Sequence, residues 1–305
     1  MSELVYKLST ALHQNEKKEV LLEIIKQKPD LNIQDKYGIT IAMNIFEYCS
    51  DKDVLLEVLK QKPDLNIQNI SGFTTATYAL TYCQDKDILL EVLKQKPDLN
   101  IQDKNGDTLA MNIFDYQKDK DVLLEVLKQK PNSNKQNIFY GMNLSMYVFE
   151  NCDDKDILLE FLKQKPNLNI QNIYGFTVAM YALIYCQDKD VLLEVSKQNL
   201  DFNIQDNNGK TFIMYALEYC EDKDVIKEIL NKKTNLTLKN KKGYTALECY
   251  IETPNYDFDV LEKLYNENCK QDNQMINLNY LRIRRKYKVL PLILFRHQKR
   301  YGIKN

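Results

Sequence analysis

The stretch LLEVLKQKPDLNIQ, residues 55–68, recurs letter for letter at residues 89–102. Close variants begin at residues 21, 123, 158 and 192, so successive starting points are separated by 34, 34, 34, 35 and 34 residues. A period of this length is typical of stacked structural repeats, in which each unit contacts only its neighbours. The repeat therefore predicts one elongated array rather than the two globular domains that 305 residues would otherwise suggest.

Glycines mark one position of the repeat. Seven of the eight glycines occupy it, and they follow segments rich in Asn or Asp, such as QDKYG at residues 34–38. This pattern predicts a tight turn in which glycine adopts a positive φ angle. A threonine two residues after most of these glycines, as at Thr40 and Thr74, is suited to cap a following helix.

Two helices are expected in each copy. The first is short and apolar, as in TIAMNIFEYC at residues 40–49. The second follows Asp-Lys-Asp, has apolar residues on one face, and is expected to end at a proline within Lys-Gln-Lys-Pro. Acids at its start and lysines at its end complement the helix dipole. We favour this account of the lysines over phosphate binding, because each Asp-Lys-Asp offsets the lysines of its own copy. For one copy, the predicted buried face is Val54, Leu55, Val58 and Leu59.

This order of turn, Gly-Xaa-Thr, short helix, loop, second helix and Asp-Leu-Asn return resembles the ankyrin repeat over about residues 1–268. The resemblance implies an all-α solenoid, a stack of helix pairs with projecting β-hairpin-like turns and a concave face lined by first helices and turns. We count an N-terminal capping pair, six regular repeats opened by Gly38 to Gly209, and a divergent last repeat after Gly243. The family's Thr-Pro-Leu-His is replaced, for example by Thr40-Ile-Ala-Met43. Methionine cannot make the hydrogen bonds of that histidine, so we expect packing to compensate for missing polar bonds between repeats.

The composition favours a soluble protein of a reducing compartment. No run of 18 apolar residues and no basic segment followed by an apolar stretch at the N-terminus occurs, so neither a membrane span nor a signal peptide is expected. Stacked helices about 8–10 Å apart do not bring one column of the repeat within disulfide reach. We expect a cytoplasmic monomer with buried free thiols, no metal and no cofactor; a nuclear location or a host-directed effector role stays open. The cysteines of that column are Cys49, Cys83, Cys152, Cys186 and Cys220.

Columns that vary while their surroundings stay constant are available for recognition. The turn tips carry large apolar residues where exposed turns usually avoid them, and the first helices carry tyrosines, which suit interfaces. We predict a non-enzymatic protein–protein interaction module, or adaptor, that binds a protein partner through the turn tips and the concave first-helix face, across the third to sixth copies. The alternative is that the tyrosines pack against the next unit and expose only their hydroxyls. The candidate residues are Ile70, Tyr78, Ile138, Phe139, Tyr140, Tyr147, Ile173, Tyr174, Tyr181 and Ile184.

Residues 269–305 differ from the array in charge. They contain ten Lys or Arg and one acid, Asp272, which leaves about −10 for residues 1–268 from a total of −1. We expect a basic C-terminal helical cap or tail. The alternative function is an RNA- or ribosome-associated factor that binds through this tail, because basic and aromatic side chains suit phosphate and base stacking. An anionic membrane surface stays open, as does ubiquitin-ligase recruitment, since Leu290-Pro291 resembles the start of F-box-like or SOCS-like ends. The basic candidates are Arg282, Arg284, Arg285, Lys286, Lys288, Arg296, Lys299 and Arg300.

Residues suited to catalysis are scarce. The two histidines, His13 and His297, lie at opposite ends of the chain, and no HExxH, phosphate-loop or GxGxxG motif occurs. Paired carboxylates such as Asp51 and Asp53 recur along the array and suit helix capping better than a single acid–base site. We therefore expect no enzymatic activity.

Overall fold

The computed structural model describes residues 3–14, 16–253 and 257–271, and within them it contains sixteen helices and no strand. The chain divides into two compact units, Met1–Ile173 and Tyr174–Asn305. None of the helices in these described ranges combines the length and apolar character needed to cross a bilayer. The helical repeat predicted from the sequence is confirmed at this level.

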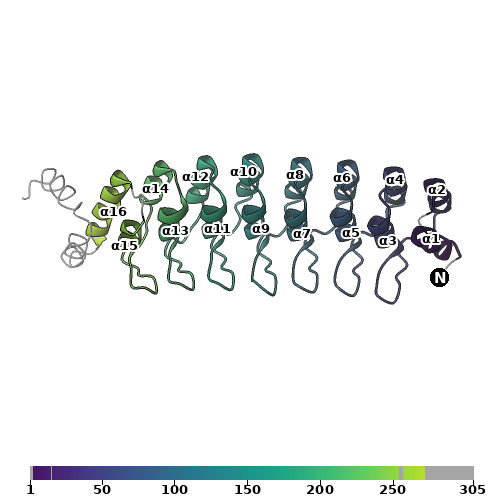
Figure 1. The fold of residues 1–305 in the computed structure, drawn as a ribbon, viewed down its shortest axis with the longest axis horizontal. Coiled ribbons are helices and arrows are strands. Elements are labelled where there is room, and N and C mark those ends of the chain that lie inside the picture. Colours follow the sequence, from purple (N-terminus) through teal and green to yellow (C-terminus); the bar gives the residue numbers. More distant parts are fainter. Residues whose placement is uncertain (1–2, 15, 254–256, 272–305) are drawn as a thin grey trace, which may run out of the picture. The chain divides into compact units, whose positions relative to one another are not determined.

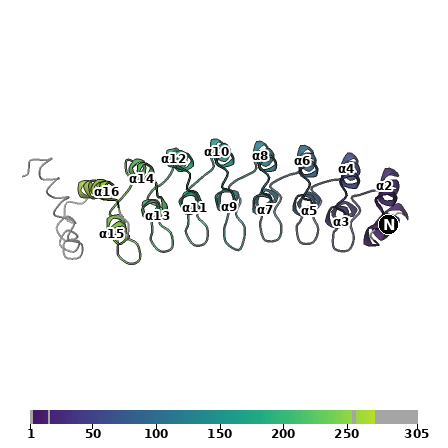
Figure 2. The same cartoon turned by 45° about the horizontal axis from the view of Figure 1, so that its top comes forward.

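The first unit is a double row of helices (Figure 1). Odd-numbered helices pack against one another in sequence, even-numbered helices do the same, and the turns project beyond the odd-numbered row (Figures 1 and 2). The helices are α1 (Glu3–His13), α2 (Lys18–Lys26), α3 (Ile41–Tyr48), α4 (Lys52–Lys60), α5 (Thr75–Tyr82), α6 (Lys86–Lys94), α7 (Leu109–Tyr116), α8 (Lys120–Lys128), α9 (Leu144–Asn151) and α10 (Lys155–Lys163).

The second unit repeats the same pairing. Contacts run from α11 to α13 to α15 and from α12 to α14 to α16. The helices are α11 (Val178–Tyr185), α12 (Lys189–Lys197), α13 (Phe212–Tyr219), α14 (Lys223–Ile229), α15 (Ala246–Ile251) and α16 (Phe258–Gln271).

Even-numbered helices begin at an aspartate in most pairs. Asp51 caps α4 by accepting hydrogen bonds from the backbone N–H groups of Asp53 and Val54, at 3.0 and 3.2 Å. These bonds satisfy donors that a helix start otherwise leaves unpaired. A helix of nine residues is marginal by itself, so its stability depends on burying one face against its neighbours. The face predicted from the sequence is the buried one in α4, namely Val54, Leu55, Val58 and Leu59.

The end of α4 differs in detail from the prediction. The helix ends at Lys60, and Lys62, directly before Pro63, adopts a left-handed conformation with φ of 51°. The N–H groups of Gln61 and Lys62 still reach the carbonyls of Val58 and Leu59, at 3.1 and 3.0 Å. The helix therefore ends before the proline is reached, because the residue before a proline is disfavoured in the right-handed helical region.

Phenylalanines are among the largest side chains of the buried, mainly aliphatic core. Phe46, Phe114 and Phe149 occupy one column of the first helices and are almost completely buried. Cysteines lie at the ends of several first helices, and every cysteine whose side chain the structure describes has a free thiol. Burial raises the pKa of Cys83 to about 12, so this group stays a neutral thiol at physiological pH.

The turns contain single β-bridges rather than hairpins. Gln68 and Thr74 form one such bridge, and no strand follows from it in the described residues. The side chain of Gln68 reaches across its own turn to the Gly72 carbonyl at 2.7 Å, and also to the Gln102 carbonyl of the next copy at 3.0 Å. The backbone N–H of Ile70 donates to the Tyr37 carbonyl of the preceding turn at 2.9 Å. Bonds to neighbouring turns thus replace those that would extend a hairpin.

Polar bonds between repeats are numerous, so the expectation that packing must compensate for their loss is wrong. Besides the glutamines of the turns, Gln95 on the second-helix side donates from Nε2 to the Leu59 carbonyl of the preceding copy at 3.0 Å. The methionine that replaces the family's histidine also has a polar role. The N–H of Thr40 points at the Met43 sulfur at 3.4 Å, while Thr40 Oγ1 accepts from the Met43 N–H at 3.1 Å. Sulfur is a weak acceptor, but here it completes the cap of α3.

Candidate functional site

The turn tips of the first unit expose the apolar side chains that the sequence singles out. Ile138 and Phe139 are 70% and 62% exposed, and Ile70, Tyr140 and Ile173 are also exposed. Their backbones are nevertheless fixed. The N–H of Ile138 donates to the Asn105 carbonyl at 2.8 Å, and the N–H of Ile173 donates to the Tyr140 carbonyl at 3.0 Å. A rigid backbone thus presents apolar side chains to solvent.

The turn at residues 137–141 is one residue longer than the others of the array. Asn137 Oδ1 accepts from the N–H groups of Tyr140 and Met142 at 3.2 and 3.0 Å. In the shorter turn, Asn69 makes the equivalent bonds to residues two and four positions later. Both ends of the longer turn are therefore anchored in the same way, and its extra residue adds an aromatic side chain, Phe139, to the exposed tip.

Tyr78 and Tyr147 brace the turns on the helices. Tyr78 is only 9% exposed and accepts a hydrogen bond from Asn69 Nδ2 at 3.1 Å. The hydroxyl of Tyr147 accepts from Asn137 Nδ2 at 3.2 Å and donates to Asp107 Oδ1 at 2.9 Å. Burial, and then the Asp107 carboxylate, raise the pKa of Tyr147 well above its usual range. In the first unit, these two tyrosines therefore match the alternative that they pack within the array better than the prediction that they form an open contact surface.

The second unit contains the remaining candidates. Tyr174 is exposed, Ile184 is half-buried, and Tyr181 is buried. The ring of Tyr181 packs edge-on against Phe176, with centroids 6.2 Å apart, and against Tyr185 at 5.5 Å. Of the three candidates in this unit, Tyr174 is therefore the most exposed.

A row of tyrosines at the ends of the first helices was not among the candidates. Tyr48, Tyr82 and Tyr116 in the first unit are all exposed, as are Tyr185 and Tyr219 in the second. The candidates come from columns that vary between copies, whereas this column is nearly constant. A constant large aromatic on the polar end of an otherwise apolar helix is the sequence signal that would have found it.

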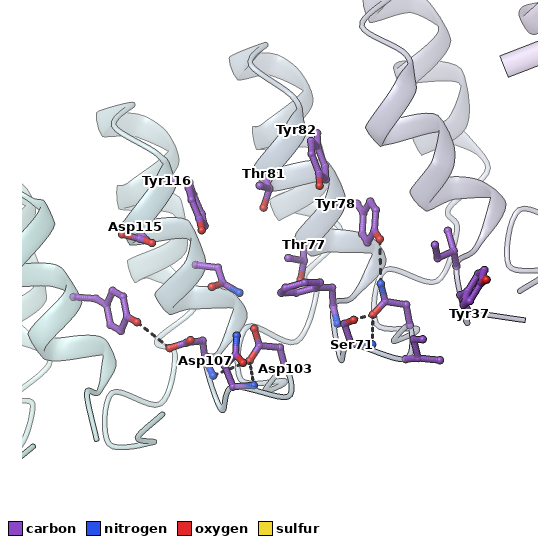
Figure 3. A pocket seen from close by; sticks show the side chains of 17 residues that line it. Tyr37, Ser71, Thr77, Tyr78, Thr81, Tyr82, Asp103, Asp107, Asp115 and Tyr116 are labelled. Atoms are coloured by element: carbon purple, nitrogen blue, oxygen red, sulfur yellow. Dashed lines mark hydrogen bonds between the residues drawn. The ribbon is translucent and has the colours of Figure 1, made fainter. Parts of the chain in front are cut away.

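Two of these exposed tyrosines, Tyr82 and Tyr116, border a groove of about 530 Å³ between the turns and the helices α5, α7 and α9 (Figure 3). Tyr82 and Tyr116 line it from the helices, and the carboxylates of Asp103, Asp107 and Asp115 line it from the turns and α7. Tyr37, Ile70 and Tyr78 also contribute, so the groove adjoins the exposed turn tips. Among the residues that the structure describes, none of those lining the groove is a lysine or arginine.

The remaining candidate residues of the sequence form no further site in the described part of the chain. Within residues 3–14, 16–253 and 257–271, no cluster of three His, Cys, Asp or Glu side chains could hold a metal ion. His13 Nδ1 lies 2.7 Å from the Ser9 carbonyl of its own helix. The basic candidates from Arg282 to Arg300, together with His297 and Leu290-Pro291, lie outside the described residues.

No known protein-family model matches the chain. No curated protein matches it significantly in sequence. The functional argument therefore depends on the geometry of the site.

Proposed function

We propose that this chain is a non-enzymatic, ankyrin-type interaction protein that holds a protein partner on its turn tips and first-helix face. The family assignment is supported by the Gly-Xaa-Thr turns with glycine at positive φ, by threonine caps such as Thr74, and by helix pairs at a regular period. An adaptor role follows from such an array, because a repeated scaffold provides an extended surface without a catalytic centre.

The observation that carries the proposal is the apolar tip at residues 138–140. In the unbound protein, the exposure of Ile138, Phe139 and Tyr140 to water is unfavourable in free energy. Soluble proteins rarely expose large contiguous apolar patches that have no binding role. The inter-turn hydrogen bonds fix the backbone before binding. A partner would therefore bury apolar area without a large entropic cost for ordering the loop.

Affinity purification with a variant of the tip tests the proposal. We expect the Ile138→Ser/Phe139→Ser/Tyr140→Ser variant to lose proteins that the unmodified chain captures. The matched control is Lys94→Ser/Lys128→Ser, which alters two side chains that are 66% and 68% exposed on the second helices. Both variants should retain the circular dichroism of the parent. Equal capture by the parent and the tip variant would contradict the proposal.

The basic tail supports a second proposal, an RNA- or ribosome-associated factor, through its charge alone. Phosphate contacts weaken steeply between about 50 and 200 mM salt, whereas an apolar interface weakens far less. A chain lacking residues 272–305 should lose RNA binding and keep the proteins that depend on the turn tips. Retention of RNA binding by the shortened chain would contradict this second proposal.

A further inference from the structure

We propose that the groove of the first unit binds a lysine-bearing segment of the protein partner, with the ammonium group held by the Asp115 carboxylate against the rings of Tyr82 and Tyr116. This inference rests on the proposed function, because it specifies the chemistry of the partner. It does not depend on the apolar turn tip at residues 138–140.

The charge of the groove favours a cation. Two of its three carboxylates already have partners within the first unit. Asp103 Oδ1 accepts from the N–H groups of Asn105 and Asp107, at 2.8 and 3.0 Å. Asp107 Oδ1 accepts from Tyr147 and from Asn137. Asp115 is exposed, and no hydrogen bond or ion pair reaches its carboxylate from the described part of the chain.

The second unit shows how a repeat of this design accommodates an ammonium group. Lys210 Nζ lies 2.5 Å from Glu218 Oε2 and 5.1 Å from the centroid of the Tyr215 ring. Glu218 stands nine positions after the turn glycine Gly209, and Lys210 stands one position after it. The lysine is therefore held between a carboxylate and an aromatic face, both from the first helix of its own repeat.

The repeat that forms the groove keeps the acid of this arrangement but lacks its lysine. Asp115 stands nine positions after Gly106, as Glu218 does after Gly209, but Asn112 takes the position of Tyr215. The aromatic contact would therefore come from other rings of the groove, such as that of Tyr116. The position of Lys210 is taken by Asp107, a second carboxylate. An internal lysine that neutralises the acid in the second unit is thus replaced by a negative charge, and the complementary cation must come from outside.

The tyrosines add attraction for the same ligand. Ammonium groups favour positions over the faces of aromatic rings, and this attraction adds to that of a nearby carboxylate. Lys36 already lies 4.8 Å from the centroid of the Tyr37 ring at the edge of the groove. Tyr82 and Tyr116 are 51% and 61% exposed, so their rings are accessible to a partner's side chain (Figure 3). A nucleic acid would instead meet carboxylates.

Fluorescence anisotropy with the full chain tests the inference. The probe is a labelled peptide of alternating lysine and serine, and its control is the same peptide with norleucine in place of lysine, which keeps the aliphatic stem and removes the charge. We expect the lysine peptide to bind at about 150 mM salt, where distant surface charges are screened. The norleucine peptide should bind at least about tenfold more weakly, because it can make neither the ion pair nor the cation–π contact.

Two variants localise the binding. Asp115→Asn should weaken the lysine peptide about fivefold, and Tyr82→Ser/Tyr116→Ser should weaken it by a similar factor. The matched control is Glu218→Gln, which removes one charge at the equivalent position of the second unit, where Lys210 already pairs with Glu218. The affinity of this variant for the lysine peptide should stay within about twofold of that of the parent. Circular dichroism confirms that each variant is folded.

The outcomes separate this inference from the proposed function. Equal binding of the norleucine and lysine peptides, or equal effects of Asp115→Asn and Glu218→Gln, would overturn the lysine site and leave the turn-tip experiment unaffected. Failure of the lysine peptide to bind the parent chain at up to about 1 mM would do the same. If the turn-tip variant captures partners normally while the groove variants lose the peptide, the lysine site stands and the turn tips are not its partner's contact.

Discussion

Charged side chains have different partners on two surfaces of the first unit. One surface is formed by the starts of the second helices (the second-helix edge), and the other by the turns and first helices (the turn face). On the second-helix edge, Lys52 reaches Asp85 at 3.1 Å and also pairs with Asp87, so the acids of one copy are neutralised by a lysine of the copy before. On the turn face, Asp115 is exposed without an ion pair from the described residues, beside the exposed ring of Tyr116.

This difference separates cohesion from recognition. The lysine and both acids of the second-helix edge recur in nearly every copy, because each pair contributes to joining one repeat to the next. A surface ion pair is worth little by itself, but the same lysine also lies beside an aspartate that caps a helix. On the turn face, acids and apolar residues change from copy to copy without changing the fold. Variation at the turn tips and at the position of Asp115 is tolerated because these side chains are exposed to solvent.

Two phenylalanines ten residues apart should give the largest contrast. Phe149 is 1% exposed and packs edge-on against Phe161, whereas Phe139 is at the turn tip. We expect Phe149→Ala to lower the free energy of unfolding by about 3–5 kcal/mol, because it leaves a cavity. Phe139→Ala should change it by less than about 0.5 kcal/mol. Urea denaturation of both variants measures the difference, and equal losses would contradict the distinction between a buried first-helix column and a free turn tip.

Two turn glycines should give the next contrast. Both Gly72 and Gly243 have positive φ, at 84° and 80°, so alanine is strained at either position by about 1 kcal/mol. A Cβ atom at Gly72 would lie 2.7 Å from Asp103 Cα of the next turn, whereas at Gly243 no atom of the residues that the structure describes comes within 4 Å. We expect Gly72→Ala to cost at least about twice as much as Gly243→Ala, because two backbones must also separate. Denaturant unfolding checks this; an equal cost would mean that turn-to-turn contact is not close in solution.

The smallest contrast concerns a helix cap. Asp222 accepts from the N–H groups of Val225 and Asp224 at 3.0 and 2.9 Å, while its neighbour Glu221 is exposed. Asp222→Ala should therefore cost about 1 kcal/mol of unfolding free energy, and Glu221→Ala close to none. Thermal denaturation at neutral pH compares them.

The cost of Asp222→Ala should also depend on pH. The hydrogen bond from Val225 is the main cause that lowers the pKa of Asp222; burial opposes it, and Lys189 adds to the lowering. Because the folded pKa is below the unfolded value of about 3.9, the stabilisation is complete above that value and is lost as the pH falls through the folded pKa. The difference in unfolding free energy between the parent and Asp222→Ala should thus be constant from about pH 5 to 7. It should decrease as the pH falls below about 4. A difference that persists at lower pH would show that the carboxylate's charge is not what caps α14.

Much of the fold could be predicted from local sequence. The period of the repeat, the turn glycines and the buried face of α4 each follow from the spacing of residues within one copy. The hydrogen bonds between copies could not be predicted in this way. Gln95 and the Leu59 carbonyl lie in different repeats, and their approach depends on how far apart the stacked helices settle.

The candidate surface was predicted in part. Exposure of Ile138 and Phe139 follows from their place in a turn, whose backbone must run over the surface. Tyr78 and Tyr82 are both tyrosines on the same first helix, four residues apart, yet one is buried and the other exposed. Only the position of the turn beside the helix distinguishes them, because Asn69 reaches the hydroxyl of Tyr78.

By itself, the sequence determined a stacked array of helix pairs with projecting turns, because a 34-residue copy buries too little apolar surface to fold alone and must use its neighbours. The tertiary structure alone decided which charges remain free. Asp107 accepts hydrogen bonds from Tyr147 and Asn137 of the following copy, whereas the carboxylate of Asp115, eight residues later, accepts none from the described residues. The reason is physical: hydrogen bonding between copies depends on distances across the stack, and these are set by packing rather than by order along the chain.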